Sequence, residues 1–291
     1  MSNSLSDAPA ATMILLSYNQ ADIISDSITS LLNQECDPLE ILISDDCSDD
    51  MTWEKIVEVV SGYRGPHTIR LNRNAENLGL IKHFNKCISI ASANIVIACG
   101  GDDISFPCRA KKIVDKFNET NALLVFSDVD KYSLNDKSLA DRILVRPPSF
   151  YINRSAFTGA TSIALYVGAS AAYHKDLFAK YGYLNDESVY EDLILGFRAS
   201  LEGRAEMITE KLVQYRIGGM TTNHAMRTTD LTNLTHRISE TKKHISVYKI
   251  RLRDVFKLRG KHIHLIPVIV FYLIKRRFRL LRLKLLLKLL Y

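Results

Sequence analysis

Several protein classes are excluded by what this sequence lacks. Its five cysteines are an odd number and show no C-x-x-C spacing, which excludes the usual disulfide frameworks and zinc sites. No apolar run approaches the roughly 20 residues that a membrane-spanning helix needs. The start of the chain has no basic region of the kind that begins a secretory signal, and no internal repeat is visible. We therefore expect a globular cytoplasmic protein with reduced thiols.

Negative charge is scarce only in the last part of the chain. From Thr241 onward there are 15 Lys and Arg residues against one acid, Asp254, whereas the preceding residues include 23 basic and 31 acidic ones. The net charge of +6 therefore combines an acidic body with a basic C-terminal tail. An acidic body repels nucleic acid, so we expect no nucleic-acid partner.

Short apolar runs alternate with helical patterns in the first third of the chain. Strand-like runs occupy residues 12–17, 40–44, 67–71 and 94–99, and apolar residues at helical spacing lie between them. The 291 residues, of which 47% are hydrophobic, are sufficient for a substantial core. The alternation predicts an α/β fold in which crossover helices connect the strands of a parallel sheet.

Polar clusters follow three of the expected strands, at residues 17–19, 44–46 and 101–103. In open parallel sheets, ligands bind outside the carboxyl ends of the strands. Because those ends meet at one edge, we expect the three clusters to lie together there. Helix capping is the alternative for each cluster, and it is the better explanation for Asp49 and Asp50, since Asp is a preferred N-cap residue.

Two adjacent carboxylates, Asp102 and Asp103, follow two glycines in the third cluster. A helix cap needs only one acid. A hard divalent cation such as Mg²⁺ or Mn²⁺ is instead held by one or two carboxylates and completes its shell with water and phosphate oxygens. We expect such an ion to hold the diphosphate of a ligand and to neutralise the charge on a departing phosphate.

Seven blocks of the sequence together resemble family 2 glycosyltransferases of the GT-A fold, over about residues 10–222. In chain order the blocks are LSYN (16–19), SDDCSDD (44–50), ENLGLIKHFN (76–85), CGGDD (99–103), VGASAAYHKDLFAKYGYLND (167–186), YEDLILGFR (190–198) and QYRIGGMT (214–221). The resemblance implies a Rossmann-like αβα sandwich with a mostly parallel central sheet. It also implies transfer of a sugar from a nucleotide-sugar with inversion of the anomeric carbon.

The resemblance, together with the composition of the last part of the chain, predicts a division into domains. Residues 1–230 would form the GT-A domain, with a nucleotide-binding half at about 10–103 and an acceptor half at about 104–222. Residues 231–291 would then form a helical, basic, membrane-associating tail.

Residue roles follow from the matched positions. Ser17, Tyr18 and Asp46 correspond to nucleotide contacts with Asp45 beside them, Asp102 and Asp103 to the metal-binding pair, Gly168 to a small-residue turn beneath the sugar acceptor, and Arg216 to a diphosphate contact. The sequence departs from the fullest acid pattern, D-x-D-D, because Gly100 stands where the first acid would be. Alternatives remain: Tyr18 could pack on the core, a turn like that at Gly168 occurs in many loops, and Arg216 could pair with an acid.

Asp192 corresponds to the catalytic base of the family, and Glu191 beside it is expected to contact substrate. An alcohol is a poor nucleophile, and a positioned carboxylate that accepts its proton accelerates such a reaction by roughly 10² to 10⁴. The alternative is that Glu191 and Asp192 are acids on a solvated first helical turn, favoured there by the helix dipole.

The end of the chain, residues 262–291, combines apolar and basic residues. The apolar run at residues 265–274 is too short to cross a bilayer, and the stretch after it has seven cations, eight leucines and no acid. This composition predicts a helix that lies on an anionic membrane surface, where each cation contributes about 1 kcal/mol. Leucines and cations do not separate cleanly at about 100° per residue, so a docking helix for a partner protein remains the alternative.

These observations predict a metal-dependent inverting glycosyltransferase of the hexosyltransferase type that uses Mn²⁺ or Mg²⁺. The donor would be a nucleotide-sugar, for which the family favours UDP, and the acceptor a polyprenyl-diphosphate-linked saccharide of surface polysaccharide (O-antigen or capsule) biosynthesis. The enzyme would bind peripherally to the cytoplasmic face of the inner membrane. The alternatives are a non-catalytic membrane-attached scaffold and a sugar-phosphate nucleotidyltransferase. The latter would need a Gly-rich basic loop after the first strand, which LSYNQADI does not provide.

Overall fold

The computed structural model describes residues 9–132, 155–217, 230–258 and 260–289. Its contacts divide the chain into two units. The first comprises Met1–Tyr132, Val167–Asn185 and Glu206–Tyr215, and the second Ser133–Tyr166, Asp186–Ala205 and Arg216–Tyr291. The domain boundary expected near residue 230 stays a prediction.

The first unit begins with four parallel strands in the order β3-β2-β1-β4. The strands are β1 (Thr12–Ser17), β2 (Glu40–Asp45), β3 (Thr68–Arg73) and β4 (Ile95–Gly100), and the crossover helices are α1 (Ile24–Leu32), α2 (Thr52–Ser61) and α3 (Leu80–Ile90). The α/β fold with crossover helices is therefore confirmed, and every expected strand lies within two residues of its predicted position.

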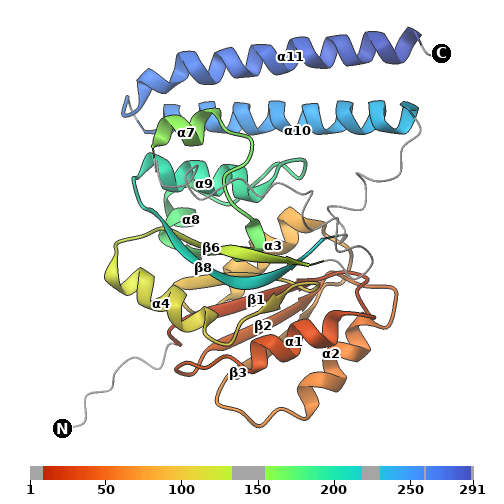
Figure 1. Cartoon of the computed structure of the whole chain (residues 1–291), viewed down its shortest axis with the longest axis vertical. Coiled ribbons are helices and arrows are strands. Elements are labelled where there is room, and N and C mark those ends of the chain that lie inside the picture. Colours follow the sequence, from red (N-terminus) through yellow and green to blue (C-terminus); the bar gives the residue numbers. More distant parts are fainter. Residues whose placement is uncertain (1–8, 133–154, 218–229, 259, 290–291) are drawn as a thin grey trace. The chain divides into compact units, whose positions relative to one another are not determined.

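Both faces of this parallel sheet are covered. Met13 and Leu15 share a hydrophobic cluster with Ile28 of α1, and α1 and α2 lie on one side of the strands while α3 lies on the other (Figure 1). Phe84 of α3 packs edge-on against Tyr173, with 5.8 Å between the ring centroids. Burial on both faces is the reason that the strands read as continuous apolar runs.

The sheet continues beyond β4 with antiparallel strands. Within the described residues it has eight strands in the order β3-β2-β1-β4-β7-β6-β8-β5. The added strands are β5 (Ile104–Ser105), β6 (Leu124–Tyr132), β7 (Ala171–His174) and β8 (Ala205–Arg216), accompanied by α4 (Arg109–Glu119), η1 (Gly168–Ser170) and α8 (Asp176–Tyr181). The parallel half of the sheet is thus the part that presents strand carboxyl ends together.

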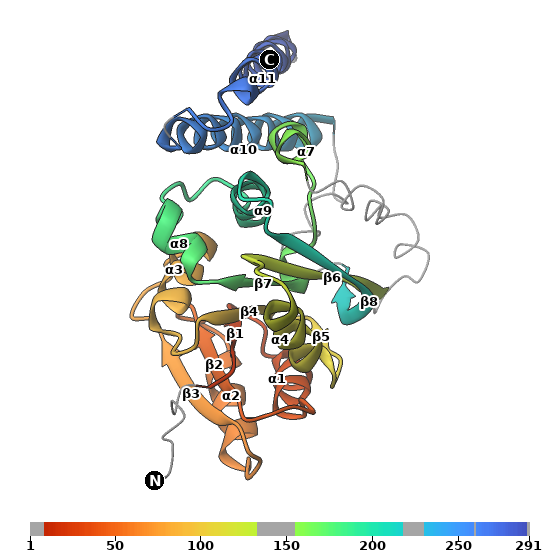
Figure 2. The ribbon, with the colours of Figure 1, turned by 90° about the vertical axis from the view of Figure 1, so that its left-hand side faces the viewer.

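The second unit is helical. It includes α7 (Ala156–Thr161), α9 (Glu191–Leu201), α10 (Asp230–Lys257), η3 (Ile263–Leu265) and α11 (Ile266–Leu289). The long helices α10 and α11 lie side by side (Figure 2). The expected helical tail is therefore confirmed. None of the helices in the described part of the chain has an apolar stretch long enough to traverse a bilayer.

A fully buried arginine joins three parts of the second unit. Arg251 of α10 donates hydrogen bonds to the backbone oxygens of Ser162 at 2.7 Å and Leu193 at 3.0 Å, and to Ala160 at 3.3 Å. Nearby, Arg198 of α9 forms a buried ion pair with Asp254 of α10 at 2.8 Å. Because an unpaired buried charge is costly, these contacts fix α10 against α9.

Candidate active site

The loops after β1, β2 and β4 meet at one edge of the sheet. Ser17 is in register with Asp45, and Leu16 with Gly100. The amide of Asp46 donates to the Ser17 oxygen at 2.9 Å, and the amide of Gly101 donates to the Leu16 oxygen at 3.0 Å. The strand order reverses between β1 and β4, which is where open α/β sheets bind ligands. The expectation that the three polar clusters meet is confirmed.

The loop after β1 is tied to the loop after β2. The Ser17 hydroxyl is buried and donates to the Ser44 backbone oxygen at 3.2 Å. Asn19, whose φ of 51° lies in the left-handed region, donates its amide to the Ser48 hydroxyl at 2.9 Å and accepts from the Asp49 amide at 3.1 Å. Tyr18, which lies between Ser17 and Asn19 in the chain, is half-buried. The roles of Ser17 and Tyr18 as nucleotide contacts stay predictions.

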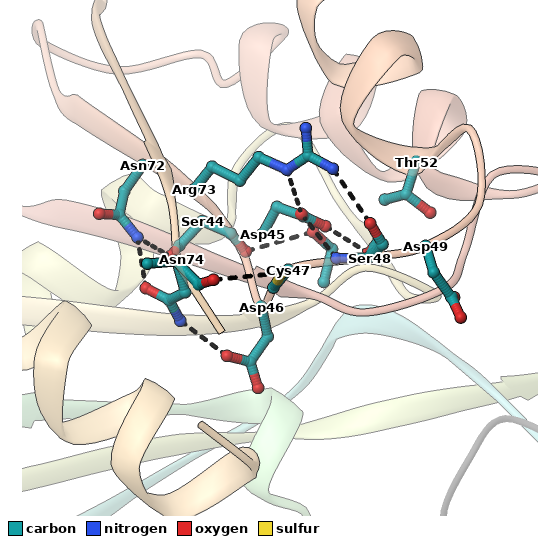
Figure 3. Close-up of polar contacts among 12 residues, drawn as sticks. Ser44, Asp45, Asp46, Cys47, Ser48, Asp49, Thr52, Asn72, Arg73 and Asn74 are labelled. Atoms are coloured by element: carbon teal, nitrogen blue, oxygen red, sulfur yellow. Dashed lines mark hydrogen bonds and ion pairs between the residues drawn. The ribbon is translucent and has the colours of Figure 1, made fainter. Parts of the chain in front are cut away.

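The carboxylate of Asp45 is fully buried and shapes the loop that follows β2 (Figure 3). It accepts from the Ser48 amide at 3.0 Å and from the Ser48 hydroxyl, and it pairs with Arg73 at 3.5 Å. These contacts close a tight turn in which Cys47 has a φ of 59°. Asp45 therefore fixes the backbone that presents Asp46.

The carboxylate of Asp46 holds the loop that leads into α3. One oxygen accepts from the Asn74 side chain at 2.7 Å (Figure 3) and from the Leu78 amide at 2.9 Å. The other oxygen accepts from the Gly79 amide at 2.9 Å. An ionised carboxylate has about four acceptor positions. Asp46 is thus rigidly placed at the edge, and its geometry allows about one further donor.

Two polar residues that support this network escaped the sequence analysis. The buried His83 ring contacts the Ser44 hydroxyl at 2.6 Å and lies 4.0 Å from the Asp46 carboxylate. Burial lowers the pKa of His83, and this effect outweighs the negative charges of Asp46 and Asp45, which raise it. Asn72 donates to the same Ser44 hydroxyl at 2.8 Å. The sequence feature that could have revealed this network is the histidine on the apolar face of the helix, because a buried polar side chain requires a hydrogen-bond partner.

The acid pair converges on Gly100. A β-carbon built on Gly100 would lie 2.8 Å from an oxygen of Asp103 and 2.9 Å from an oxygen of Asp102. One oxygen of each carboxylate therefore lies on the same side of the Gly100 backbone, Asp103 being buried and Asp102 half-buried. A side chain at position 100 would therefore require both carboxylates to shift from these positions.

This arrangement fits a hard divalent cation. The described residues contain no group of three or more His, Cys, Asp or Glu side chains that could enclose a metal ion. Mg²⁺ commonly needs only one or two carboxylates, because water and substrate phosphates supply its other ligands. Two converging carboxylate oxygens at the ligand edge of the sheet meet that requirement.

The loop at residues 101–103, which carries the acid pair, is tightly packed. A β-carbon on Gly101 would lie 2.2 Å from the side-chain oxygen of Gln20, and this oxygen is buried with no hydrogen-bond partner among the described residues. The Ser27 hydroxyl donates to the Gly101 oxygen at 2.9 Å. A side chain at position 101 would therefore displace the Gln20 side chain, and the hydrogen bond from Ser27 helps to hold the loop that carries Asp102 and Asp103.

A buried arginine connects β4 and β5, which flank the acid loop, to the predicted acceptor turn, and sequence reasoning missed it. Arg109 of α4 donates to the backbone oxygens of Ala98 and Ala169, each at 2.7 Å, and to the Ser105 hydroxyl at 2.9 Å. Ala169 follows Gly168 in η1. Gly168 is therefore positioned relative to the end of β4, while its contact with substrate stays a prediction.

In the second unit, Glu191 and Asp192 occupy the first turn of α9. Burial is the largest cause, and the negative charge of Glu191 the next, of a rise in the pKa of Asp192 to about 8. The positive charge of Arg251 lowers this pKa but does not cancel the rise. Burial also raises the pKa of Glu191. Both side chains are half-buried, so they are not acids on a freely solvated turn. A carboxylate whose pKa lies near neutrality is suited to proton transfer.

The last matched block is only partly described. Arg216 is half-buried at the end of β8, and the residues of this block from 218 onward lie outside the described residues. The diphosphate contact of Arg216 stays a prediction.

The mostly parallel α/β sheet, with helices on both faces and polar loops gathered where the strand order reverses, has the architecture expected for the GT-A fold. The chain belongs to glycosyl transferase family 2, whose model matches residues 12–182, more than half of its length.

Curated relatives agree with this membership. EpsE of Bacillus subtilis is 31% identical over 110 residues, which cover 38% of this chain and 39% of EpsE. The succinoglycan biosynthesis protein ExoO of Rhizobium meliloti is 29% identical over 131 residues, covering 45% of this chain and 36% of ExoO. The matched segments thus span well under half of these two relatives.

Two solved structures share the fold. S. aureus TarS, in complex with UDP-GlcNAc, superposes with a TM-score of 0.64 at 16% identity and covers 92% of this chain and 72% of TarS. The mannosyltransferase PcManGT of Pyrobaculum calidifontis, in complex with GDP-Man and Mn²⁺, gives a TM-score of 0.62 at 15% identity, with 90% and 73% covered. At these identities the likeness concerns the fold.

Proposed function

We propose that the chain is a metal-dependent inverting glycosyltransferase that transfers a hexosyl group from a nucleotide-sugar, with UDP as the favoured nucleotide, to a saccharide hydroxyl. The observation on which this depends is the convergence of the Asp102 and Asp103 oxygens beside Gly100, at the edge where β1, β2 and β4 end. Family membership supports the reaction class. The nucleotide-sugars bound to TarS and PcManGT support the donor class.

In this proposal the first unit binds the donor. Asp102 and Asp103 would hold Mn²⁺ or Mg²⁺, and the ion supplies positive charge that stabilises the departing nucleoside diphosphate. Ser17, Tyr18 and Asp46 contact the nucleotide, and Asp45 holds their loop. The rigid hydrogen bonds around Asp46 support this role, because a preorganised acceptor discriminates between bases without a reorganisation cost.

Asp192 would act as the general base. It accepts the proton of the acceptor hydroxyl while the new C–O bond forms and the bond to the diphosphate breaks. Attack on the face opposite the leaving group inverts the anomeric carbon. The raised pKa of Asp192 supports this assignment, because a more basic carboxylate accepts the proton more readily. Glu191 and Gly168 contact the acceptor, and Arg216 contacts the diphosphate.

The acceptor in this proposal is a polyprenyl-diphosphate-linked saccharide of surface polysaccharide biosynthesis, bound at the cytoplasmic face of the inner membrane. The basic helix α11 supports a location at anionic lipid, and the name of ExoO links a relative to polysaccharide assembly.

A panel of UDP-, dTDP- and GDP-sugars, assayed with and without Mn²⁺, tests the proposal. We expect turnover of one donor class that requires the added ion and releases the nucleoside diphosphate. Equal turnover without the ion would contradict metal dependence. Binding of no nucleotide-sugar would instead indicate a scaffold, and formation of a nucleotide-sugar from a nucleoside triphosphate would indicate a nucleotidyltransferase.

A further inference from the structure

Helix α11 has two apolar sides, and within the described residues one side is buried and the other is exposed. Ile269, Leu273 and Leu283 are buried, and Leu280 and Leu287 are partly buried with them. Leu283 packs in one cluster with Leu234 and Ile238 of α10. At about 100° per residue these positions of α11 lie on one side of the helix, which is the side that faces α10.

The opposite side of α11 is exposed. We call it the outer stripe, and it consists of Phe271, Ile274, Phe278, Leu281, Leu285 and Leu289. Phe278, for example, is 68% exposed. At about 100° per residue, the six side chains fall within an arc of about 80° that lies opposite the buried side.

Six exposed cations border this stripe. Arg277, Lys284 and Lys288 project along one edge of it, and Lys275, Arg279 and Arg282 along the other. Helix α11 contains no acid. Each row of cations lies between the buried apolar side and the outer stripe. This explains why the leucines and cations of α11 do not fall on two opposite faces of the helix.

Helix α10 lacks such a stripe. Among the large apolar side chains of its described residues, only Phe256 is exposed, at 62%. The outer stripe is therefore a property of α11 and does not follow from the general composition of the tail.

We propose that the outer stripe is a membrane-insertion face, which lies in the boundary between headgroups and acyl chains of an anionic bilayer. The inference rests on the membrane attachment proposed above and assigns it to these six residues. Apolar side chains enter the boundary while Lys and Arg on both edges extend to the lipid phosphates. Pairing of the stripe with a second copy would bring rows of cations together, which repel.

Flotation of the full chain with vesicles tests this assignment. We expect binding to phosphatidylcholine vesicles that contain phosphatidylglycerol and little binding to phosphatidylcholine alone. The double variant Phe278→Ser/Leu285→Ser should bind the anionic vesicles at least about tenfold more weakly, because two inserted side chains are lost. The matched control is Phe256→Ser, which removes an aromatic ring of similar exposure from α10 and should bind like the native chain.

Three results would overturn the assignment. They are equal binding to both vesicle types, native-like binding of the double variant, and a native dimer that the double variant converts to a monomer without any vesicle binding. Donor hydrolysis of the double variant, measured without vesicles, should equal that of the native chain. If no variant turns over a donor while the vesicle results hold, the proposed reaction fails and the insertion face stands.

Discussion

The ligand edge of the sheet is rich in negatively charged side chains and helix α11 in positively charged ones, but the two sets differ in burial and in how firmly they are fixed. At the edge, Asp45, Asp46 and Asp103 are buried, and backbone amides or neighbouring side chains fix the first two. On α11, six cations are exposed at the ends of flexible side chains. A fixed set of charges suits a ligand of defined geometry, whereas a mobile set suits a fluid surface with many equivalent phosphates.

This contrast predicts that neutralising one charge at the edge has a far larger effect than neutralising one charge on α11. Asp103→Asn should have the largest effect, because it removes one of two converging metal ligands. We expect loss of Mn²⁺-dependent turnover by at least about 10²-fold. The matched control is Asp49→Asn, an exposed acid in the loop after β2 that should turn over like the native enzyme. Metal-dependent turnover in Asp103→Asn at the native rate would refute the metal assignment.

The second prediction concerns Asp192. Asp192→Asn should lower the rate of sugar transfer by roughly 10² to 10⁴ while donor binding, measured by calorimetry, stays unchanged. Glu187→Gln, which changes an exposed acid nearby in the chain, serves as the control and should transfer normally. A weaker donor affinity with an unchanged maximal rate would show that Asp192 binds the donor and is not the base.

The third prediction is a pH profile. Asp192 must be deprotonated to accept a proton, and its pKa is raised to about 8, so the transfer rate should rise with pH up to about 8. An ordinary aspartate would give a flat profile above about pH 5. Glu191→Gln removes a negative charge that raises this pKa, and it should therefore move the rising limb to lower pH. A limb that does not move would mean that another group titrates.

The fourth prediction tests the glycine at the acid pair. Gly100→Asp restores the fullest acid pattern, yet its β-carbon would crowd both carboxylate oxygens. We expect the Mn²⁺ concentration for half-maximal turnover to rise by roughly threefold to tenfold, which corresponds to about 1 kcal/mol. Gly100→Ala is the matched variant without the added charge and should show a similar rise. Tighter binding of Mn²⁺ by Gly100→Asp would show that charge outweighs crowding.

The smallest effect belongs to α11. Arg277→Gln removes one of its exposed cations and should weaken binding to anionic vesicles by about fivefold, since each cation contributes about 1 kcal/mol. Turnover of the donor in solution should not change. A complete loss of vesicle binding would mean that the cation forms a specific contact, and the contrast with the edge would no longer hold.

The sequence was most informative where local pattern determines structure. The four parallel strands and the meeting of the polar clusters at one edge followed from alternation and from the rule on strand ends. The network around Asp46 could not be predicted in this way, because Asn74 and Gly79 lie 28 and 33 positions away from it and their contacts depend on strand register.

The helical tail shows the opposite limit. Its composition was sufficient to predict a basic helix, but not which side of α11 is exposed. The buried side depends on Leu234 and Ile238 of a different helix, and no periodicity within α11 reveals that partner. The role of Arg251 also escaped prediction, because cations are common in the tail and only packing distinguishes a buried one.

The burial of Arg251 limits where this protein can be truncated. A truncation that ends before this residue leaves the oxygens of Ala160, Ser162 and Leu193 without their guanidinium donor. It also removes Asp254, and with it the buried ion pair of Arg198. Such a fragment would misfold for reasons unrelated to lipids. A cut between α10 and α11 spares those bonds and removes instead the packing of Leu283 against Leu234 and Ile238, so a shortened chain should end there and carry polar residues at these two positions.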